Sequence, residues 1–281
     1  MEFGIDLPNF GEFGDPGVLL DLALEAEAAG WDGFFLWDHL LSGGQIPATD
    51  PWMVMSAIAV RTERIRLGPM VTPLARRRMN KLARETVALD HLSRGRLIMG
   101  VGLGFFDDKE FTAFGDEGAP RIRAQILDES LQILEGLWGG EAFTFEGQHL
   151  RATTSPFLPR PLQQPRIPIW VAGLWPNKRP MRRAAAWDGA FPIDAGGDLT
   201  KQMSPGAMAE AIAYIGTQRT ADSAFDIVHA GLLSGEREPD IALTQRYADV
   251  GVTWWLEHVY PSRMSLAALR KFIRLGPPRT T

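Results

Sequence analysis

The sequence contains no cysteine, which excludes disulfide bonds, a thiolate nucleophile and a metal site built on thiolates. No apolar run approaches the roughly 20 residues that a membrane-spanning helix needs. The opening MEFGIDLPNF carries acids and a proline instead of the basic and then apolar pattern of a signal peptide. These absences fit a reducing compartment, and we expect a soluble cytoplasmic protein with no membrane association.

Positive charge is also scarce, because 29 Lys and Arg face 34 Asp and Glu and give a formal net charge of −5. Nucleic-acid binding needs a dominant basic surface, so the sequence predicts no nucleic-acid partner. The one dense basic run is Arg76-Arg77-Arg78. It has two interpretations: a site for a phosphate or polyglutamate tail, or a solvated face.

What is present is clearest between Arg64 and Phe106, where an apolar strand pattern, a helical pattern and a second strand pattern follow each other. The helical pattern covers 79–92 and stops at Ser93-Arg94-Gly95. The second strand, 97–101, is apolar on both faces, as in a buried parallel sheet, and Gly102 and Gly104 stand at its end. This stretch therefore predicts a strand-helix-strand unit.

The same alternation recurs along the chain, and eight strand-helix pairs predict a single (β/α)8 TIM barrel over residues 1–281. Residues 139–165 break the pattern with aromatic, glycine and proline residues, so we expect an irregular insertion or hairpin between strands four and five. In such barrels the site lies where the strands end. The strand ends carry Asn9, Asp38, His39, Thr72, Gly102, Gly104, Gly173, Ile193, His229, Glu257 and His258.

Three chemistries fit these strand ends poorly. The five histidines show no paired spacing for a metal, so we predict no metal, although His39, His229 and His258 leave a mononuclear site geometrically possible. Schiff-base catalysis needs a lysine at a strand end, and the five lysines fall in predicted helices or loops. Glycoside hydrolysis needs two facing carboxylates, which strands four and seven do not supply.

The glycines at the ends of strands four and five have two interpretations. They relieve crowding where the barrel narrows, or they let a ligand approach bare backbone. Ala172-Gly173 is followed by Asn177-Lys178 at a predicted helix start, and backbone N–H groups beside cations bind anions there. Two such openings at neighbouring strands would suit a cofactor that carries a phosphate.

At this point the chain resembles the luciferase-like superfamily of flavin- and deazaflavin-dependent oxidoreductases. The resemblance covers nearly the whole chain, in an order and spacing more specific than any glycine motif. The segments that carry it are GWDGFFLWDHL, RIRLGPMVTPL, LARETVALDHLSRGRLIMGVGLGFFDDKEFTAFG, RIRAQILDESLQILEGLW, EGQHL and IPIWVAGLWPNKRPMRRAAAWDGAFP.

The resemblance implies an enzyme whose barrel mouth holds reduced flavin mononucleotide (FMN) or coenzyme F-420 and acts on a small-molecule substrate. It implies that His39 is catalytic, with Asp38 as its neighbour in an Asp-His pair or as a local cap. It places Met70, Val71 and Thr72 at a bulge with a non-prolyl cis peptide against the cofactor ring. The implied cofactor-binding residues are Met70, Val71, Thr72, Gly102, Gly104, Ala172, Gly173, Asn177 and Lys178.

The resemblance divides on the cofactor. Asp38-His39 matches the deazaflavin group, whereas Gly104–Gly115 matches flavin luciferases and has Phe105 where deazaflavin sugar-phosphate dehydrogenases carry a catalytic glutamate. We expect an FMN-dependent monooxygenase, served by a separate flavin reductase and forming a homodimer. The alternatives are F-420-dependent hydride transfer and a non-catalytic flavin-binding relative. Under either cofactor, Trp37, Phe105, Phe106, Trp254 and Trp255 would supply an apolar wall or pack the barrel.

Overall fold

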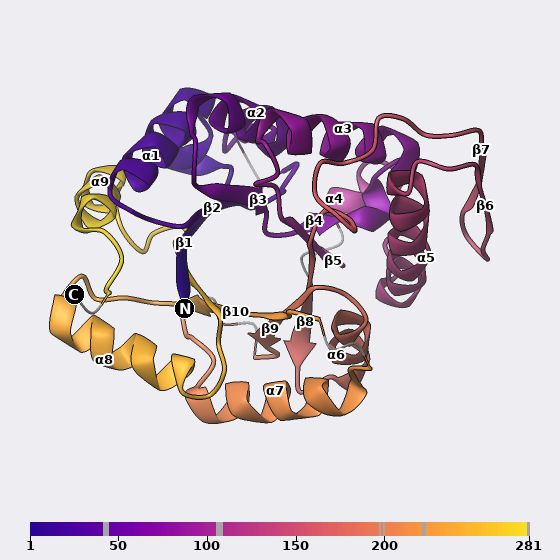
Figure 1. The fold of residues 1–281 in the computed structure, drawn as a ribbon. Helices are drawn as coiled ribbons and strands as arrows, with labels where there is room; N and C mark the ends of the chain where they lie inside the picture. The colour runs from indigo at the N-terminus through magenta and orange to yellow at the C-terminus, as the bar shows by residue number, and fades with distance from the viewer. Residues whose placement is uncertain (42–44, 105–108, 197, 199, 221–222, 280–281) are drawn as a thin grey trace.

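The computed structural model describes residues 1–281 except 42–44, 105–108, 197, 199, 221–222 and 280–281. Figure 1 shows a ring of strands with helices around its outside. The strands are β1 (Glu2–Leu7), β2 (Gly33–Leu36), β3 (Arg66–Pro69), β4 (Thr72–Pro73), β5 (Met99–Gly102), β6 (Phe143–Glu146), β7 (Arg151–Thr154), β8 (Ile169–Trp175), β9 (Gly189–Asp194), β10 (Asp226–Gly231) and β11 (Trp254–His258).

The helices follow most strands, and α1, α2, α7 and α9 begin at side-chain caps. Asp15 and Asp50 accept hydrogen bonds from backbone N–H groups of the first turns of α1 and α2, and a proline follows each cap. The helices are α1 (Pro16–Ala28), α2 (Pro51–Arg61), α3 (Met79–Leu92), α4 (Lys109–Thr112), α5 (Pro120–Trp138), α6 (Lys178–Ala185), α7 (Pro205–Gln218), α8 (Arg237–Ala248) and α9 (Leu266–Leu275), with 3-10 turns η1 (Gly11–Phe13) and η2 (Leu74–Arg76).

The strand ring is a parallel barrel, as the sequence predicts. Its nine strands run in the order β3-β2-β1-β11-β10-β9-β8-β5-β4. The two ends of this order, β3 and β4, are halves of one strand interrupted at Met70-Val71, and a bridge from Leu67 to Leu97 joins β3 to the segment before β5. Counting β3 and β4 as one strand gives the eight strands of a (β/α)8 barrel.

The predicted insertion contains a hairpin. Strands β6 and β7 pair antiparallel between Phe143 and Thr154, and Figure 1 shows them projecting beside α5, away from the barrel. Glu129 of α5 accepts hydrogen bonds from the backbone N–H groups of Gln148, His149 and Leu150, so the turn region is attached to that helix. The insertion therefore lies outside the strand ring.

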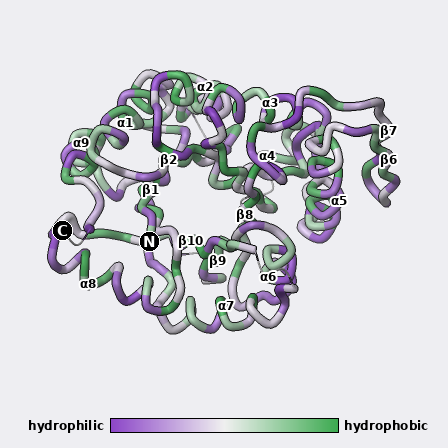
Figure 2. Tube along the Cα trace, viewed as in Figure 1, coloured by the Kyte–Doolittle hydropathy of each residue, from purple (hydrophilic) through white to green (hydrophobic). Residues whose placement is uncertain are grey.

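Alternation along each strand separates two cores. Inward residues such as Phe35, Trp170 and Leu256 form one buried cluster inside the barrel. Outward residues pack against the helices in a second, larger cluster. Figure 2 shows hydrophobic and hydrophilic residues interspersed along α5, whose buried residues are mostly apolar. Among the described helices, none is long and apolar enough to cross a membrane.

The crowding interpretation holds for the interior of strand β5. A Cβ atom at Gly100 would lie 2.1 Å from the carbonyl oxygen of Pro69, and one at Gly102 would lie 2.8 Å from Val71 Cγ2. These positions need glycine because the chain from the end of β3 to the start of β4 passes close to β5. Beside them, the peptide bond between Met70 and Val71 is cis, as the family resemblance implied.

Candidate active site

A cavity of about 470 Å³ opens where the barrel strands end. Its position agrees with the general rule for barrel sites. Polar groups reach it from β1, β2, α4 and β11, including Asp6, His39, Glu110 and His258. Its apolar wall includes Trp37, Met70, Val71, Ala172, Phe191 and Ile193.

Asp38 and His39 are neighbours in sequence but have different surroundings. Phe35 and Trp37 of strand two face the barrel interior, so alternation turns Asp38 outward and His39 inward. Asp38 touches the cavity edge, but its side chain is buried toward α2. His39 lines the cavity with a half-buried ring.

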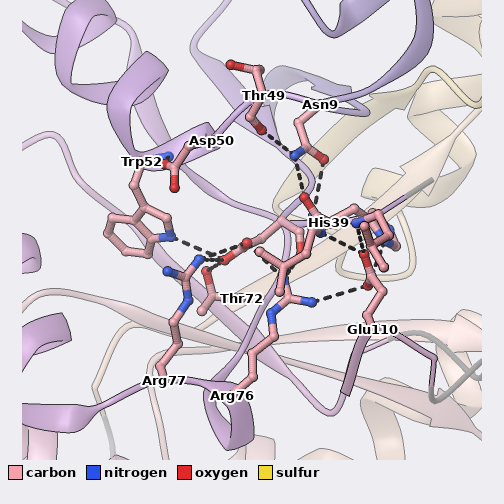
Figure 3. Close-up of polar contacts among 12 residues, drawn as sticks. Asn9, His39, Thr49, Asp50, Trp52, Thr72, Arg76, Arg77 and Glu110 are labelled. Atoms are coloured by element: carbon pink, nitrogen blue, oxygen red, sulfur yellow. Dashed lines mark hydrogen bonds and ion pairs between the residues drawn. The ribbon is translucent and has the colours of Figure 1, made fainter. Parts of the chain in front are cut away.

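The carboxylate of Asp38 is surrounded by donors, and Figure 3 labels the residues that supply them, Trp52, Thr72, Arg76 and Arg77. Oδ2 accepts from Thr72 Oγ1 at 2.6 Å, Trp52 Nε1 at 3.2 Å and Arg77 Nη2 at 2.7 Å. Oδ1 accepts from Arg76 Nη2 at 2.9 Å and Arg77 Nη2 at 2.8 Å. Both oxygens are therefore occupied by groups of the protein.

These contacts also fix the ionisation of Asp38. Burial would raise its pKa, but the charges of Arg77 and Arg76 and the hydrogen bond from Thr72 outweigh burial and lower the pKa below its ordinary value. An ionised carboxylate with no room for another donor is poorly suited to receive a proton from a ligand. The structure therefore places Asp38 in a structural ion-pair cluster rather than an Asp-His pair.

His39 pairs instead with Glu110 of α4. His39 Nδ1 lies 3.0 Å from Glu110 Oε2. Burial would raise the pKa of Glu110, but hydrogen bonds from His39 and from the Leu41 backbone, with the nearby charges, lower it. An ionised Glu110 accepts only, so Nδ1 carries the proton in this pair and Nε2 is the ring nitrogen suited to exchange a proton with a ligand.

The protein holds this pair in place on both sides. Arg76 Nη1 donates to Glu110 Oε2 at 3.2 Å, and the backbone N–H groups of Leu40 and Leu41 donate to Oε1. Asn9, a predicted strand-end residue, donates from Nδ2 to the carbonyl oxygen of His39 and accepts from its N–H. His39 is therefore fixed at both its ring and its backbone.

Sequence reasoning missed Glu110 and Asp6. Glu110 stands eight residues after Gly102, the last residue of β5, on the one-turn helix α4 that the strand pattern does not predict. Asp6 interrupts the otherwise apolar end of β1 (Ile5-Asp6-Leu7), and a charged residue on a buried strand was the available signal. Both acids line the cavity.

Seven of the nine predicted cofactor-binding residues line the cavity: Met70, Val71, Gly102, Gly104, Ala172, Gly173 and Asn177. The other two predicted residues lie elsewhere. Thr72 is buried and donates to Asp38, and Lys178 lies over the rings of Trp175 and Tyr214 at 3.8 and 4.2 Å. Neither is among the residues that line the cavity.

Gly173 contributes differently from the expectation. Its position faces α6, where a Cβ atom would lie 2.1 Å from Pro180 Cβ. The absent side chain therefore lets α6 pack against β8, and a larger residue here would disturb this packing first. The backbone of Gly173 still borders the cavity.

The basic run Arg76-Arg77-Arg78 as a whole matches neither of its two interpretations. Arg76 is buried and pairs with Asp38 and Glu110, and Arg77 pairs with Asp38, so these two residues serve neither an anionic tail nor a solvated face. Arg78 is exposed, as the second interpretation expects. Cations that do line the cavity are Arg123 of α5, Arg183 of α6 and Lys201.

Other strand-end residues point elsewhere. His229 stacks on Tyr247 of α8 at 4.2 Å between ring centroids, and burial lowers its pKa to about 3. Trp255 also faces the helical layer, and Trp254 lies deeper in the barrel. Phe105 and Phe106 lie outside the described residues. Among those described, no three His, Asp or Glu side chains are arranged to hold a metal.

Comparison with known proteins gives a family and relatives. The family model for luciferase-like monooxygenases matches residues 1–213. The chain is 30% identical to the F420-dependent glucose-6-phosphate dehydrogenase of Nocardia farcinica over 271 residues, which is 92% of this chain and 77% of that protein. It is 34% identical to the Nakamurella multipartita protein of the same name over 171 residues, or 59% of this chain.

That second match spans about half of the relative, at 48% of its length. Among solved structures, the monooxygenase RslO1 from Streptomyces bottropensis superposes with a TM-score of 0.76, at 22% identity, over 98% of this chain and 97% of that one. At this identity the superposition supports the fold alone. The barrel is therefore found again in a solved protein of similar extent.

Proposed function

The chain belongs to the luciferase-like monooxygenase family and is an oxidoreductase of that family, and we propose that it transfers hydride between coenzyme F-420 and a small organic substrate. The observation that carries the proposal is the fixed His39–Glu110 pair on an otherwise largely apolar cavity. It supplies one oriented proton-transfer group beside space for a flat ring.

The residues of the cavity fit such a cofactor. Met70, Val71 and Ala172 form an apolar surface against which a ring system would pack. Asn177 stands at the start of α6, and Arg183 and Lys201 line the cavity. These polar and cationic groups would hold the phosphate and acidic tail. When bound, coenzyme F-420 supplies the hydride chemistry.

The chain's own residues then have separate roles. His39 would give or take the proton that accompanies hydride transfer, through Nε2. Glu110 fixes the protonated Nδ1, and Arg76 fixes Glu110. The apolar wall excludes water from the cofactor ring.

The choice of coenzyme F-420 over FMN rests on two relatives, 34% and 30% identical, whose names carry F420. FMN-dependent oxygenation is the second candidate. It is favoured by the Gly104–Gly115 loop pattern, which resembles that of flavin luciferases. Glucose 6-phosphate is not carried over as substrate, because Phe105 replaces the glutamate expected for sugar-phosphate dehydrogenases.

An anaerobic titration with each reduced cofactor, at low and high salt, tests the proposal. We expect tighter binding of coenzyme F-420, weakened by salt because its acidic tail meets cations that ions screen. A clear preference for reduced FMN, with oxygen consumption when air is admitted, would favour the second candidate. Failure to bind either cofactor would reject both.

A further inference from the structure

A second polar cluster lies in the cavity, apart from His39 and Glu110. It consists of Asp6 at the end of β1, Trp37 after β2 and His258 at the end of β11, all of which line the cavity. Asp6 Oδ2 accepts from Trp37 Nε1 at 3.1 Å and lies 2.9 Å from His258 Nδ1. Asp6 and His258 stand on strands of the barrel, and Trp37 directly follows a third strand.

The two rings of this cluster are fixed relative to each other. Trp37 and His258 are stacked, with 5.3 Å between centroids and 24° between planes. His258 Nδ1 faces Asp6, so the ring turns its other nitrogen, Nε2, away from that carboxylate. The imidazole is thereby held in one orientation before any ligand arrives.

One atom of the cluster lacks a partner. Asp6 is 1% exposed, and no described residue donates a hydrogen bond to its Oδ1 atom. Buried carboxylate oxygens normally accept hydrogen bonds, and one without a partner in a residue that lines a cavity indicates a missing donor. Oδ2 already accepts two donors, so Oδ1 is the oxygen left for a ligand.

We propose that Asp6 and His258 form a subsite that recognises a hydroxyl group of the small organic substrate. In this subsite Asp6 Oδ1 accepts a hydrogen bond from the hydroxyl group. The subsite rests on the proposed function in one respect only, because its ligand is taken to be the substrate of the proposed oxidoreductase. Asp6 acts here as a binding residue, and Trp37 positions it.

A hydroxyl suits this cluster better than other donors. It can donate its single proton to Asp6 Oδ1, and its lone pairs remain available to a further donor, because a hydroxyl is both donor and acceptor. A ketone offers no donor to the carboxylate. An ammonium group has three N–H donors, more than Asp6 Oδ1 and the second ring nitrogen of His258 could accept.

The test compares two probes of the same shape, cyclohexanol and cyclohexanone, by ligand-observed NMR on the full chain. Wild type should bind the alcohol more tightly than the ketone. In Asp6→Asn the side-chain NH2 can donate to a carbonyl, so the preference should fall by at least about fivefold, comparable to the loss of one hydrogen bond.

Asp194→Asn is the matched control, because Asp194 also lines the cavity and the substitution removes the same charge. It should keep the preference within about twofold, an order-of-magnitude expectation for a group outside the cluster. An equal loss in both variants would mean a general charge effect and overturn the subsite. So would a wild type that does not distinguish the probes.

Two further measurements keep the result interpretable. If Asp6→Asn does not fold, His258→Phe should weaken cyclohexanol and leave cyclohexanone unchanged; unchanged alcohol binding would overturn the proposal. Cofactor titration of Asp6→Asn should match wild type, and weakened cofactor binding with an intact alcohol preference would reassign the cluster to the cofactor. The NMR test needs no cofactor, so it succeeds or fails separately from the proposed function.

Discussion

Asp38 and His39 stand at the end of the same strand, yet their side chains differ in surroundings. The Asp38 side chain is buried in the protein, and the His39 side chain faces the cavity. Asp38 accepts from Trp52, Thr72, Arg76 and Arg77, and its side chain is fully buried. His39 is half-buried, faces the cavity and is held by Glu110. The comparison shows that strand alternation, more than residue type, separates a buried acid from a histidine that faces the cavity.

The largest expected effect is the loss of stability when Asp38 is replaced. Asp38→Asn leaves two arginines without their carboxylate, and removing one partner of a buried ion pair should lower the free energy of unfolding by about 3 kcal/mol or more. Denaturant unfolding measures this. A change below about 1 kcal/mol, the value for an exposed pair, would mean that Asp38 is not part of a buried cluster.

The same residue predicts a pH dependence. Its folded pKa is lowered below the ordinary value of about 3.9, so its stabilising contribution is complete above about pH 4 and is lost as the pH falls further. Asp38→Asn should therefore unfold with a shallower acid dependence than wild type below pH 4. Parallel acid curves for the two proteins would contradict the assignment.

Replacing His39 should instead lower turnover and leave stability unchanged. His39→Ala removes the oriented proton-transfer group, so turnover should fall by at least about 100-fold while the thermal midpoint and cofactor affinity stay near wild type. Steady-state kinetics and a cofactor titration measure the two sides. Near-normal turnover would make His39 structural as well.

Gly173→Leu tests a glycine that packs rather than binds. Its side chain would meet Pro180 of α6, so we expect a loss of about 1–3 kcal/mol in stability from overpacking. Unfolding of this variant beside Gly206→Leu, whose Cβ meets nothing within 4 Å, gives the comparison. Equal stability in both variants would reject the packing account.

The smallest expected effect is at the support of His39. Glu110→Gln keeps the shape but removes the charge, and turnover should fall about tenfold, roughly the 1.5 kcal/mol of one hydrogen bond to a charged group. Kinetics of the single variants and of Glu110→Gln with His39→Ala measure the coupling. Fully additive losses would mean that Glu110 does not act through His39.

The barrel was predictable because strand and helix patterns repeat along the chain. Seven cofactor-binding predictions reached the cavity since they stand at strand ends. The partners of Asp38 and His39 were not predictable, because Arg76, Arg77 and Glu110 come from turns and a one-turn helix that carry no periodic signal. The position of the Lys178 ammonium group over the rings of Trp175 and Tyr214 was not predictable, because local sequence does not show which aromatic rings lie beside it.

Several expectations stay predictions: a homodimer, a separate flavin reductase, a cytoplasmic location and FMN as the cofactor. They depend on partners or conditions beyond a single chain. The metal site considered from three histidines is not formed among the described residues, because His229 turns toward α8.

The most direct test of the central claim is an anaerobic titration of reduced coenzyme F-420 against wild type, His39→Ala and Ala172→Phe. Ala172 lines the cavity from β8, so a phenyl ring there should fill the space for the cofactor ring. We predict equal affinity for wild type and His39→Ala, and at least about tenfold weaker binding for Ala172→Phe, as for overpacking of roughly 1.4 kcal/mol or more. Equal binding by all three proteins would show that the cofactor does not occupy this cavity.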